Sequence, residues 1–288
     1  MSTILETRGL RYEYGSGLPS EVAALDGVDI RIEEGEFVGL IGHTGSGKST
    51  LIQHFNGLLA PTSGQVLFRG QDIHEKGYRL RELRFRVGLV FQYPEYQLFE
   101  ETVEKDISFG PRNMGLSEDE IRERVRMAAS YVGLTEDVMD KSPFDLSGGQ
   151  KRRVAIAGVL AMKPEVLILD EPTAGLDPEG ASQILREIRA FREESGTTVI
   201  LVSHNMEDVA RTADRLIVMN HAKVALEGTP EQVFGTPERL ESLGLDVPQV
   251  TKIFWLLKQR GVDVETSVYT VKYAKNLILK MIGGGASC

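Results

Sequence analysis

One short segment constrains the fold of this chain more than any other. Gly42–Thr50 reads GHTGSGKST, follows the apolar run Phe37–Ile41 and precedes the helically spaced Leu51, Ile52 and Phe55. A strand, a glycine-rich loop and a helix in this order are the context that a phosphate-binding loop requires. The glycines let backbone N–H groups curl around phosphate oxygens, and the helix N-terminus adds a favourable dipole. The segment therefore predicts an α/β domain of the P-loop type.

The individual side chains of this loop have distinct expected roles. Lys48 is expected to reach the β and γ phosphates of a nucleotide, and Ser49 to offer its hydroxyl to Mg²⁺. A glycine-rich turn with an incidental lysine is the alternative, and the flanking strand and helix argue against it. We expect the phosphate cradle to consist of Gly42, Gly45, Gly47, Lys48, Ser49 and Thr50.

The rest of the first 228 residues alternates short apolar runs with helical periodicity. Near-continuous apolar runs predict strands that are covered on both faces, and hence a parallel sheet. The alternation of Val28, Ile30 and Ile32, with a further run at Val66–Phe68, predicts a smaller antiparallel piece at the edge. The parallel strands are expected at Phe37–Ile41, Val87–Phe91, Val166–Leu169, Thr197–Val202 and Leu216–Met219.

Between Tyr93 and Lys163 the strand signal disappears. Ser117 and Glu120 have the spacing of a capping box, and Ile121 and Val125 continue with helical periodicity. We therefore expect a helical subdomain, at about residues 93–163, inserted into the α/β domain.

A domain boundary is expected near Gly228, giving a nucleotide-binding domain at 1–228 and a helical domain at 229–288. The second part holds six acids and seven bases, whereas the whole chain has a net charge of −9. Pro248 is expected to start one amphipathic helix, and Val271–Met281 suggests a second. Two helices this short need a further surface to pack on, so the segment is expected to contact the main domain or another subunit.

The composition excludes several classes of protein. A net charge of −9 argues against broad binding of nucleic acid or anionic lipid, because both need a basic face. No run approaches the roughly 18 apolar residues of a spanning helix. The first residues lack the basic and apolar regions of a signal peptide. The only cysteine, Cys288, makes an internal disulfide impossible and fits a reducing, cytosolic compartment.

Polar residues follow two of the predicted strands. Asp170 and Glu171 close the run at 166–169, and His204 follows the run at 197–202. Ligands of open α/β sheets bind at such carboxyl ends. Asp170 could hold Mg²⁺, and Glu171 could polarise a water molecule as a general base. His204 alone is more often structural, but its place after a parallel strand favours a catalytic role.

Ser147-Gly148-Gly149-Gln150, preceded by Leu146, forms a second candidate anion cradle at a helix start. The phosphate loop, LSGGQ, LILDEP, Gly175-Leu176-Asp177 and His204 occur in this order. In this combination they resemble the ATP-binding cassette (ABC) ATPases, and the resemblance covers about residues 3–228.

This resemblance implies that two nucleotide-binding domains face each other head to tail. Ser147, Gly149 and Gln150 of one subunit would then close the ATP site of the other. Gln92 matches the glutamine that touches Mg²⁺ in the family, and Asp177 matches the loop that crosses the interface. Tyr14 matches the aromatic that stacks on adenine, with Tyr12 as the fallback and a surface aromatic as the alternative reading. The base-reading motif of GTPases is absent, so ATP is the expected nucleotide.

The segments at 91–99 and 152–162 resemble more narrowly the energy-coupling factor (ECF) transporter ATPases, especially the second of their two paralogous subunits. That resemblance implies a peripheral ATPase at the cytoplasmic face of the cell membrane, paired with its paralogue as a heterodimer. Its other partners would be a transmembrane coupling subunit and substrate-binding membrane proteins that take up vitamins or transition-metal ions. Glu95 would be an acidic contact for the coupling subunit, or simply a solvated loop acid.

Two other functions stay open. An ABC protein of DNA repair or translation would typically have a long coiled-coil insertion or two cassettes in one chain, and this sequence has neither. A cassette that regulates a membrane partner without translocating anything is a third reading, which the sequence leaves open behind the leading reading of a transport ATPase. The basic cluster Arg79–Arg86 is interrupted by Glu82 and indicates a solvated helix, and the five histidines lack metal-ligand spacing.

Overall fold

The computed structural model describes residues 2–15 and 22–283, so Cys288 lies outside the described residues. Within these ranges a six-stranded sheet has the order β10-β9-β3-β8-β7-β6. The strands β6, β7, β8, β3 and β9 pair in parallel, and β10 is antiparallel to β9. The expected α/β fold is confirmed. The bounds are β3 (Phe37–Gly42), β6 (Val87–Val90), β7 (Val166–Asp170), β8 (Thr198–Val202), β9 (Arg215–Asn220) and β10 (Lys223–Gly228).

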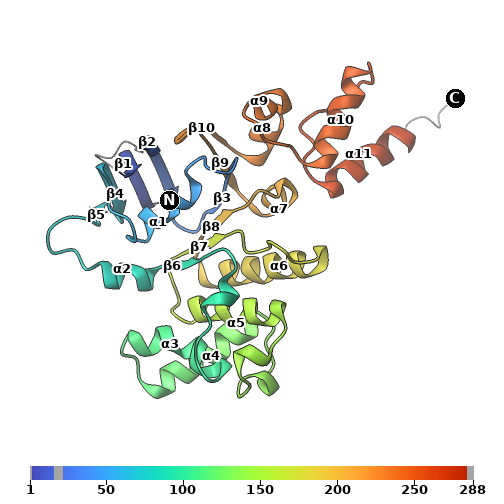
Figure 1. Ribbon diagram of the computed structural model, residues 1–288. Helices are drawn as coiled ribbons and strands as arrows, with labels where there is room; N and C mark the ends of the chain where they lie inside the picture. The colour runs from blue at the N-terminus through green and yellow to red at the C-terminus, as the bar shows by residue number, and fades with distance from the viewer. Residues whose placement is uncertain (1, 16–21, 284–288) are drawn as a thin grey trace.

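The alternating segments form an antiparallel sheet of their own instead of extending an edge of the parallel sheet. Its order in the described residues is β2-β1-β4-β5, and helix α1 (Lys48–Phe55) lies between the two sheets (Figure 1). Ile30, Leu51, Phe55 and Leu40 share one buried core cluster, which joins both sheets to α1. The bounds are β1 (Thr3–Tyr14), β2 (Val22–Glu33), β4 (Ser63–Phe68) and β5 (Gln71–Asp72).

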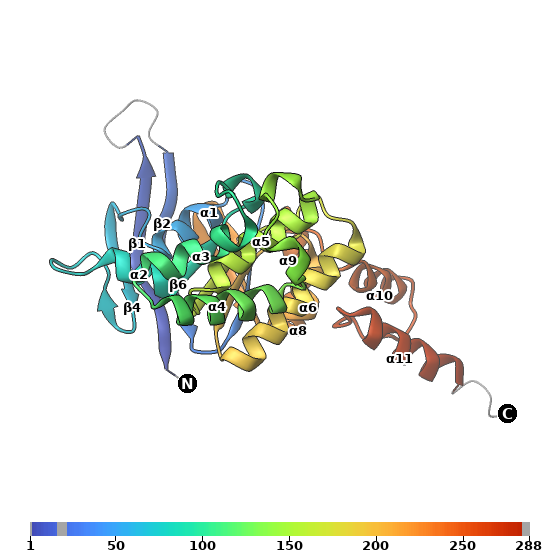
Figure 2. The ribbon, with the colours of Figure 1, turned by 90° about the horizontal axis from the view of Figure 1, so that it is seen from below.

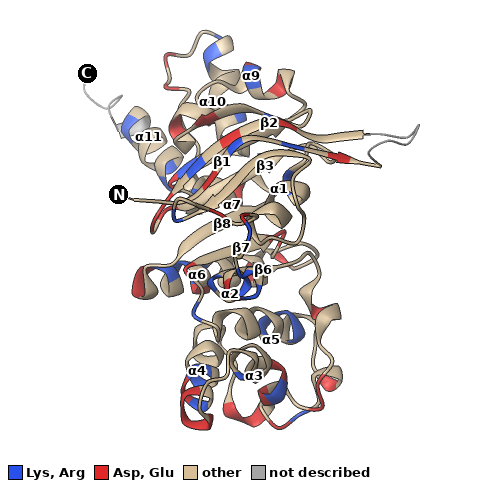
Figure 3. Cartoon of the chain, turned by 90° about the vertical axis from the view of Figure 1, so that its left-hand side faces the viewer, with Lys and Arg blue, Asp and Glu red and all other residues tan. Residues whose placement is uncertain are grey.

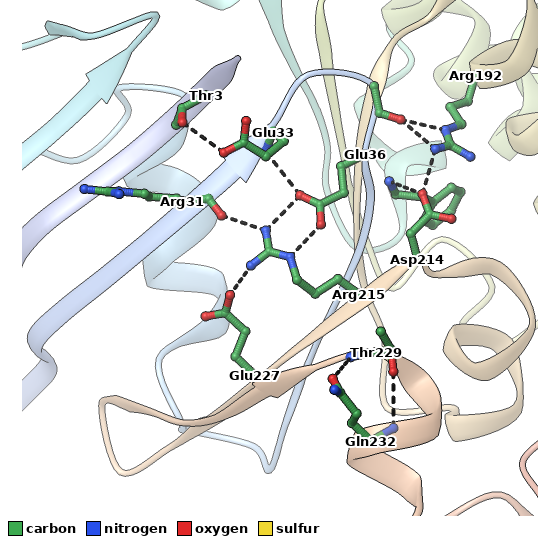
Figure 4. A network of polar contacts seen from close by, with 12 residues as sticks. Thr3, Arg31, Glu33, Glu36, Arg192, Asp214, Arg215, Glu227, Thr229 and Gln232 are labelled. Atoms are coloured by element: carbon green, nitrogen blue, oxygen red, sulfur yellow. Dashed lines mark hydrogen bonds and ion pairs between the residues drawn. The ribbon is translucent and has the colours of Figure 1, made fainter. Parts of the chain in front are cut away.

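A polar network joins the antiparallel sheet to the parallel sheet. Arg215 of β9 donates to the Glu36 carboxylate at 2.5 and 2.8 Å and to the Arg31 carbonyl oxygen of β2 at 2.6 Å. It also pairs with Glu227 of β10 (Figure 4). The Arg215 and Glu36 side chains are 19% and 14% exposed. Because one guanidinium bonds three segments, it fixes how the antiparallel sheet sits on the parallel one.

The segment between β6 and β7 is helical, as the sequence predicts. The capping box of Ser117 and Glu120 is present and starts α4 at Glu118. Figures 1 and 2 show α3, α4 and α5 packed together beside the parallel sheet. The bounds are η1 (Pro94–Gln97), α3 (Val103–Asn113), α4 (Glu118–Tyr131), η2 (Glu136–Val138), η3 (Pro143–Asp145) and α5 (Gly148–Leu160), with α2 (Leu80–Arg86) just before β6.

The C-terminal region divides into two parts. Phe234 and Leu240, from two short helices that the sequence did not predict, belong to the main core. Phe254 of α10, Ala274 of α11 and Val268 between them belong to a small separate cluster. These two helices lie at the opposite end from α3 and α4 (Figure 3). The remaining bounds are α6 (Pro178–Ser195), α7 (Met206–Thr212), α8 (Pro230–Phe234), α9 (Pro237–Ser242), α10 (Gln249–Gln259) and α11 (Val271–Gly283).

Candidate nucleotide site

A cavity of about 800 Å³ lies at the carboxyl ends of β3, β7 and β8. This edge of an open α/β sheet is where ligands bind, because the loops there diverge and leave room. Residues from several segments that are far apart in the sequence meet in it. Its lining includes Tyr14, Gly42, Gly45, Gly47, Lys48, Ser49, Thr50, Gln92, Asp170, Glu171 and His204, all named from the sequence.

The loop between β3 and α1 packs closely against backbone from neighbouring segments. A Cβ atom at Gly42 would lie 2.4 Å from the Met219 carbonyl oxygen, and one at Gly47 would lie 2.4 Å from the Ala24 carbonyl oxygen. Gly47 also has a φ of 104°, which only glycine adopts without strain. Because α1 begins at Lys48, the N-terminus of this helix faces the loop. The backbone can therefore offer its N–H groups to an anion.

Lys48 extends back over the same loop. Its Nζ donates to the carbonyl oxygens of Gly42 at 2.7 Å and His43 at 3.0 Å. Burial lowers the pKa of Lys48, and the carboxylates of Glu171 and Asp170 offset part of this shift. A cation held beside an anion-binding loop is suited to an incoming phosphate group.

Asp170 and Ser49 bring together two oxygen atoms that could act as metal ligands. The Ser49 hydroxyl donates to Asp170 Oδ2 at 3.4 Å, and Asp170 is 9% exposed. Burial raises the pKa of Asp170, and the neighbouring Glu171 carboxylate adds to the rise. A cation would relieve both effects, and hydroxyl and carboxylate oxygens suit Mg²⁺. No group of three or more His, Cys, Asp or Glu side chains in the described chain could hold a metal.

Glu171, His204 and Gln92 surround the remaining part of the cavity. The His204 Nδ1 atom lies 2.8 Å from Glu171 Oε2, and their side chains are 73% and 13% exposed. Glu171 has a φ of 50°, an unusual value for a residue with a Cβ atom. Its N–H donates to the Val202 carbonyl oxygen at 3.0 Å, which ties it to the end of β8. Gln92, exposed just beyond β6, faces the same cavity.

The two candidate aromatics at the end of β1 differ in position. Tyr14 is 45% exposed and lines the cavity, and its hydroxyl lies 3.2 Å from Thr50 Oγ1. Tyr12 packs edge-on against Tyr14 and against His54, with ring centroids 4.9 Å apart in both pairs. It is absent from the cavity lining. Tyr14 therefore lies in the cavity wall, and the fallback Tyr12 does not.

The other predicted site residues lie outside this cavity. Ser147 and Gln150 cap α5 reciprocally, through bonds of 3.1 and 3.3 Å between each side chain and the other's N–H. Asp177 caps α6 by accepting from the N–H groups of Glu179 and Gly180 at 3.0 and 2.9 Å. Ser147, Gly149, Gln150 and Asp177 are not part of the lining. The predicted site thus falls into two groups within one chain.

Several contacts had no signal in the sequence. Gly244, Leu245 and Asp246, from the segment between α9 and α10, line the cavity beside His204. Glu95, suggested above as a contact for a membrane subunit, is engaged within the chain. Its carboxylate accepts from the Arg152 guanidinium at 2.8 and 3.1 Å.

Residues 25–174 match the family described as ABC transporter. The chain belongs to the ABC transporter ATPases. The chain is 55% identical to the energy-coupling factor transporter ATP-binding protein EcfA2 of Caldanaerobacter subterraneus, over 97% of this chain and 98% of the relative. It is 56% identical to the EcfA2 protein of Clostridium perfringens, over 96% of this chain and 98% of the relative.

Solved ABC cassettes share the fold. The cbiO1 protein of Clostridium perfringens, described as part of the ABC transporter complex cbiONQ, gives a TM-score of 0.75 at 43% identity, covering 88% of this chain and 99% of that one. The cassette MJ0796, described as a dimer bound to ADP and Pi, gives 0.71 at 29% identity, covering 78% and 98%. This ABC ATPase is therefore the ATP-binding subunit of an ECF-type transporter. Across the described residues, every helix is too short or too polar to span a membrane.

Proposed function

We propose that this subunit powers uptake of a vitamin or a transition-metal ion. It would work at the cytoplasmic face of the cell membrane, through a transmembrane coupling subunit and substrate-binding membrane proteins. The relatives' names support the ECF type, and the arrangement of the site supports a machine that closes around ATP. The observation that carries the proposal is the division of the phosphate-binding elements into two groups. Because the LSGGQ element of this chain lies outside its own nucleotide cavity, the element would bind phosphate only at the nucleotide of a second chain.

That second chain would be the paralogous ATP-binding subunit. Lys48 and Ser49 would then hold the nucleotide of their own cavity, while Ser147 and Gly149 would serve the phosphates of the partner's nucleotide. Asp177, exposed at the start of α6, would lie at the interface between them. Closure around ATP would draw the two subunits together, and hydrolysis would release them.

Within the cavity, the proposed roles follow from the contacts described above. Ser49, Asp170 and Gln92 would hold Mg²⁺ together with phosphate oxygens, and the ion would neutralise phosphate charge. Glu171 would accept a proton from the attacking water, and His204 would orient that carboxylate. Tyr14 would stack on the adenine ring.

Two exposed apolar surfaces support the proposed partners. Next to Gln92, Tyr96 is 85% exposed and Phe99 is 58% exposed, and we assign this surface to the transmembrane coupling subunit. On the C-terminal helices, Val271 is 69% exposed and Leu279 is 57% exposed, and we assign that surface to the paralogous ATPase. Contiguous exposed apolar surface is typical of protein–protein interaction sites.

Copurification from detergent-solubilised membranes tests the assembly, with this chain as bait and mass spectrometry to identify the captured chains. We expect a second ATP-binding chain and a hydrophobic multi-span chain. Tyr96→Ala with Phe99→Ala should lose the multi-span chain only, and Val271→Asp with Leu279→Asp should weaken capture of the ATPase paralogue. Each pair of substitutions is the control for the other. Consistent absence of a multi-span chain from the wild-type sample would contradict the proposal.

Uptake by cells separates transport from regulation. A strain that carries the Glu171→Gln variant should assemble the complex but fail to accumulate the vitamin or metal ion. Normal accumulation with this variant would favour a cassette that regulates a membrane partner without powering it.

A further inference from the structure

Arg152 is a buried arginine that contacts two segments of the nucleotide site. It lies on α5, just after the LSGGQ element, and its side chain is 3% exposed. Its Nε and Nη2 donate to the two carboxylate oxygens of Glu95 at 3.1 and 2.8 Å. Burial alone would raise the pKa of Glu95, but the hydrogen bonds and the charge of Arg152, together with a backbone hydrogen bond, offset the burial and lower the pKa. The pair is therefore ionised and bidentate, the strong form of this contact.

The same guanidinium reaches a second segment. Its Nη1 donates to the carbonyl oxygen of Pro172 at 3.2 Å and to that of Ala174 at 2.6 Å. Glu95 lies three residues after Gln92, and Pro172 directly follows Glu171. Arg152 thus bonds the turn that carries Gln92 and the turn that carries Glu171.

Both turns contain strained backbone. Tyr93, next to Gln92, has a φ of 54°, and Glu171 has a φ of 50°. Residues with a Cβ atom adopt this left-handed region at a cost, and they keep it only where the surroundings hold them. The Arg152 guanidinium lies 5.9 Å from the centre of the Tyr93 ring, within the range of a cation–π contact. The hydrogen bonds from Arg152 to Glu95, Pro172 and Ala174 tie both turns to α5.

We propose that Arg152, acting with Glu95, is a positioning residue for ATP hydrolysis, which holds Gln92 and Glu171 at a fixed separation across the cavity. This inference rests on the roles proposed above for Gln92 and Glu171. Arg152 is absent from the lining of the cavity, so we expect its loss to affect hydrolysis more than nucleotide binding. Because it sits at the start of the LSGGQ helix, a movement of that helix also moves both turns.

The neighbouring Arg153 provides a matched control. It lies on the same helix, its side chain is 14% exposed, and it pairs with Glu187 at 2.7 Å. It also donates to the Val132 carbonyl oxygen. Like Arg152, Arg153 is a largely buried arginine with several hydrogen bonds. Its partners, however, lie in α6 and directly after α4 instead of in the nucleotide site.

The test compares Arg152→Gln, Arg153→Gln and Glu95→Gln in the purified transporter complex, with ATP turnover, ATP binding and thermal unfolding measured for each. For Arg152→Gln we expect kcat to fall about ten- to hundredfold, because small misplacement of catalytic groups has effects of this size. The dissociation constant for ATP should stay within about twofold, since the phosphate loop is unchanged. Arg153→Gln should unfold at a lower temperature yet keep kcat within about twofold of wild type.

Equal losses of kcat in Arg152→Gln and Arg153→Gln would overturn the proposal, and so would a parallel loss of ATP affinity. If Arg152→Gln fails to fold, Glu95→Gln decides instead. It keeps the bonds to Pro172 and Ala174 and loses only the ionic bond to the Gln92 turn, so kcat should fall by about three- to tenfold. Unchanged kcat in Glu95→Gln would contradict the proposal. Normal turnover of Glu171→Gln would instead refute the proposed role of Glu171, whatever the Arg152 result.

Discussion

The imidazole Nδ1 of His204 lies 2.8 Å from Oε2 of Glu171, so the residues after two strands, 33 positions apart in the sequence, meet in one close polar contact. This geometry lets the imidazole hold the carboxylate in one orientation. Glu171→Gln should lower kcat by about 10²- to 10⁴-fold, the range of a general base. The KM for ATP should change little, because the phosphate loop and Tyr14 are unaffected. Steady-state ATP turnover by the assembled transporter measures both constants.

His204→Ala is the companion of that variant. If His204 acts only through Glu171, the double variant should be no slower than Glu171→Gln alone, since residues that act as a unit have non-additive effects. Additive losses would show that His204 acts independently of Glu171, and wild-type kcat in Glu171→Gln would remove the carboxylate from the mechanism.

Asp170→Asn should stabilise the nucleotide-free protein while weakening its use of Mg²⁺ and ATP. The folded-state pKa of Asp170 is raised by burial and by Glu171. The favourable contribution of protonated Asp170 to the free energy of unfolding is therefore complete when the pH lies below the pKa of the unfolded state. It is lost as the pH rises through the pKa of the folded state. At neutral pH the ionised carboxylate is a cost, and its removal should raise the unfolding temperature by about 2 °C or more. The gain should shrink towards pH 4.

Asp106→Asn is the matched control for this prediction. Asp106 is also buried, with its pKa raised by burial, but it lies outside the cavity lining. The Asp106→Asn variant should leave the affinity of the protein for Mg²⁺ and ATP unchanged. A lower unfolding temperature for Asp170→Asn at neutral pH, measured by scanning calorimetry, would contradict the argument.

Gly149→Ala tests whether LSGGQ acts on a partner's nucleotide. A Cβ atom at Gly149 meets no atom within 4 Å in the described chain, and alanine is a better helix former than glycine. The variant should therefore fold at least as stably as wild type. In the assembled transporter a phosphate that approaches this backbone would meet the new methyl group, and kcat should fall by about tenfold or more.

Gly158→Ala is the control, since it lies on the same helix and its Cβ atom would make only ordinary contacts, at 3.7 and 4.0 Å. It should keep wild-type kcat. Full activity of Gly149→Ala in the assembled complex would mean that no phosphate comes close to this residue.

Much of this site could be predicted because its parts are local. The loop at Gly42–Thr50 is continuous, Asp170 ends a buried strand, and Glu171 and His204 come shortly after buried strands. Parallel strands end at the same edge, so their following residues must meet. The sheet register then brings Glu171 to Val202, as the bond between them shows.

What could not be predicted depends on contacts between distant segments. Arg152 and Glu95 are 57 residues apart, and neither has a neighbour in the sequence that indicates the other. The helices α8 and α9 have five and six residues, too few to show a helical period. That the antiparallel strands form their own sheet depends on α1 filling the space between the sheets, which an alternating pattern does not show.

Asp246 shows how the C-terminal region affects the nucleotide site. Its side chain is 67% exposed and pairs with Lys252 at 3.5 Å, and it lines the cavity with Lys48 and His204. Because ATP is anionic, a carboxylate in the wall should oppose its binding. Asp246→Asn should tighten ATP binding by about two- to fivefold at low salt, the range of an exposed charge interaction.

This gain should diminish as salt rises, because screening weakens interactions between exposed charges. Calorimetric titration with ATP, at low and at high salt, measures the effect. Glu241→Gln is the control, since Glu241 is an exposed acid of α9 outside the cavity lining. Both variants change the net charge by the same amount, so a general charge effect would shift them equally. Only a larger change in Asp246→Asn, lost at high salt, supports a direct action of Asp246 on the bound nucleotide.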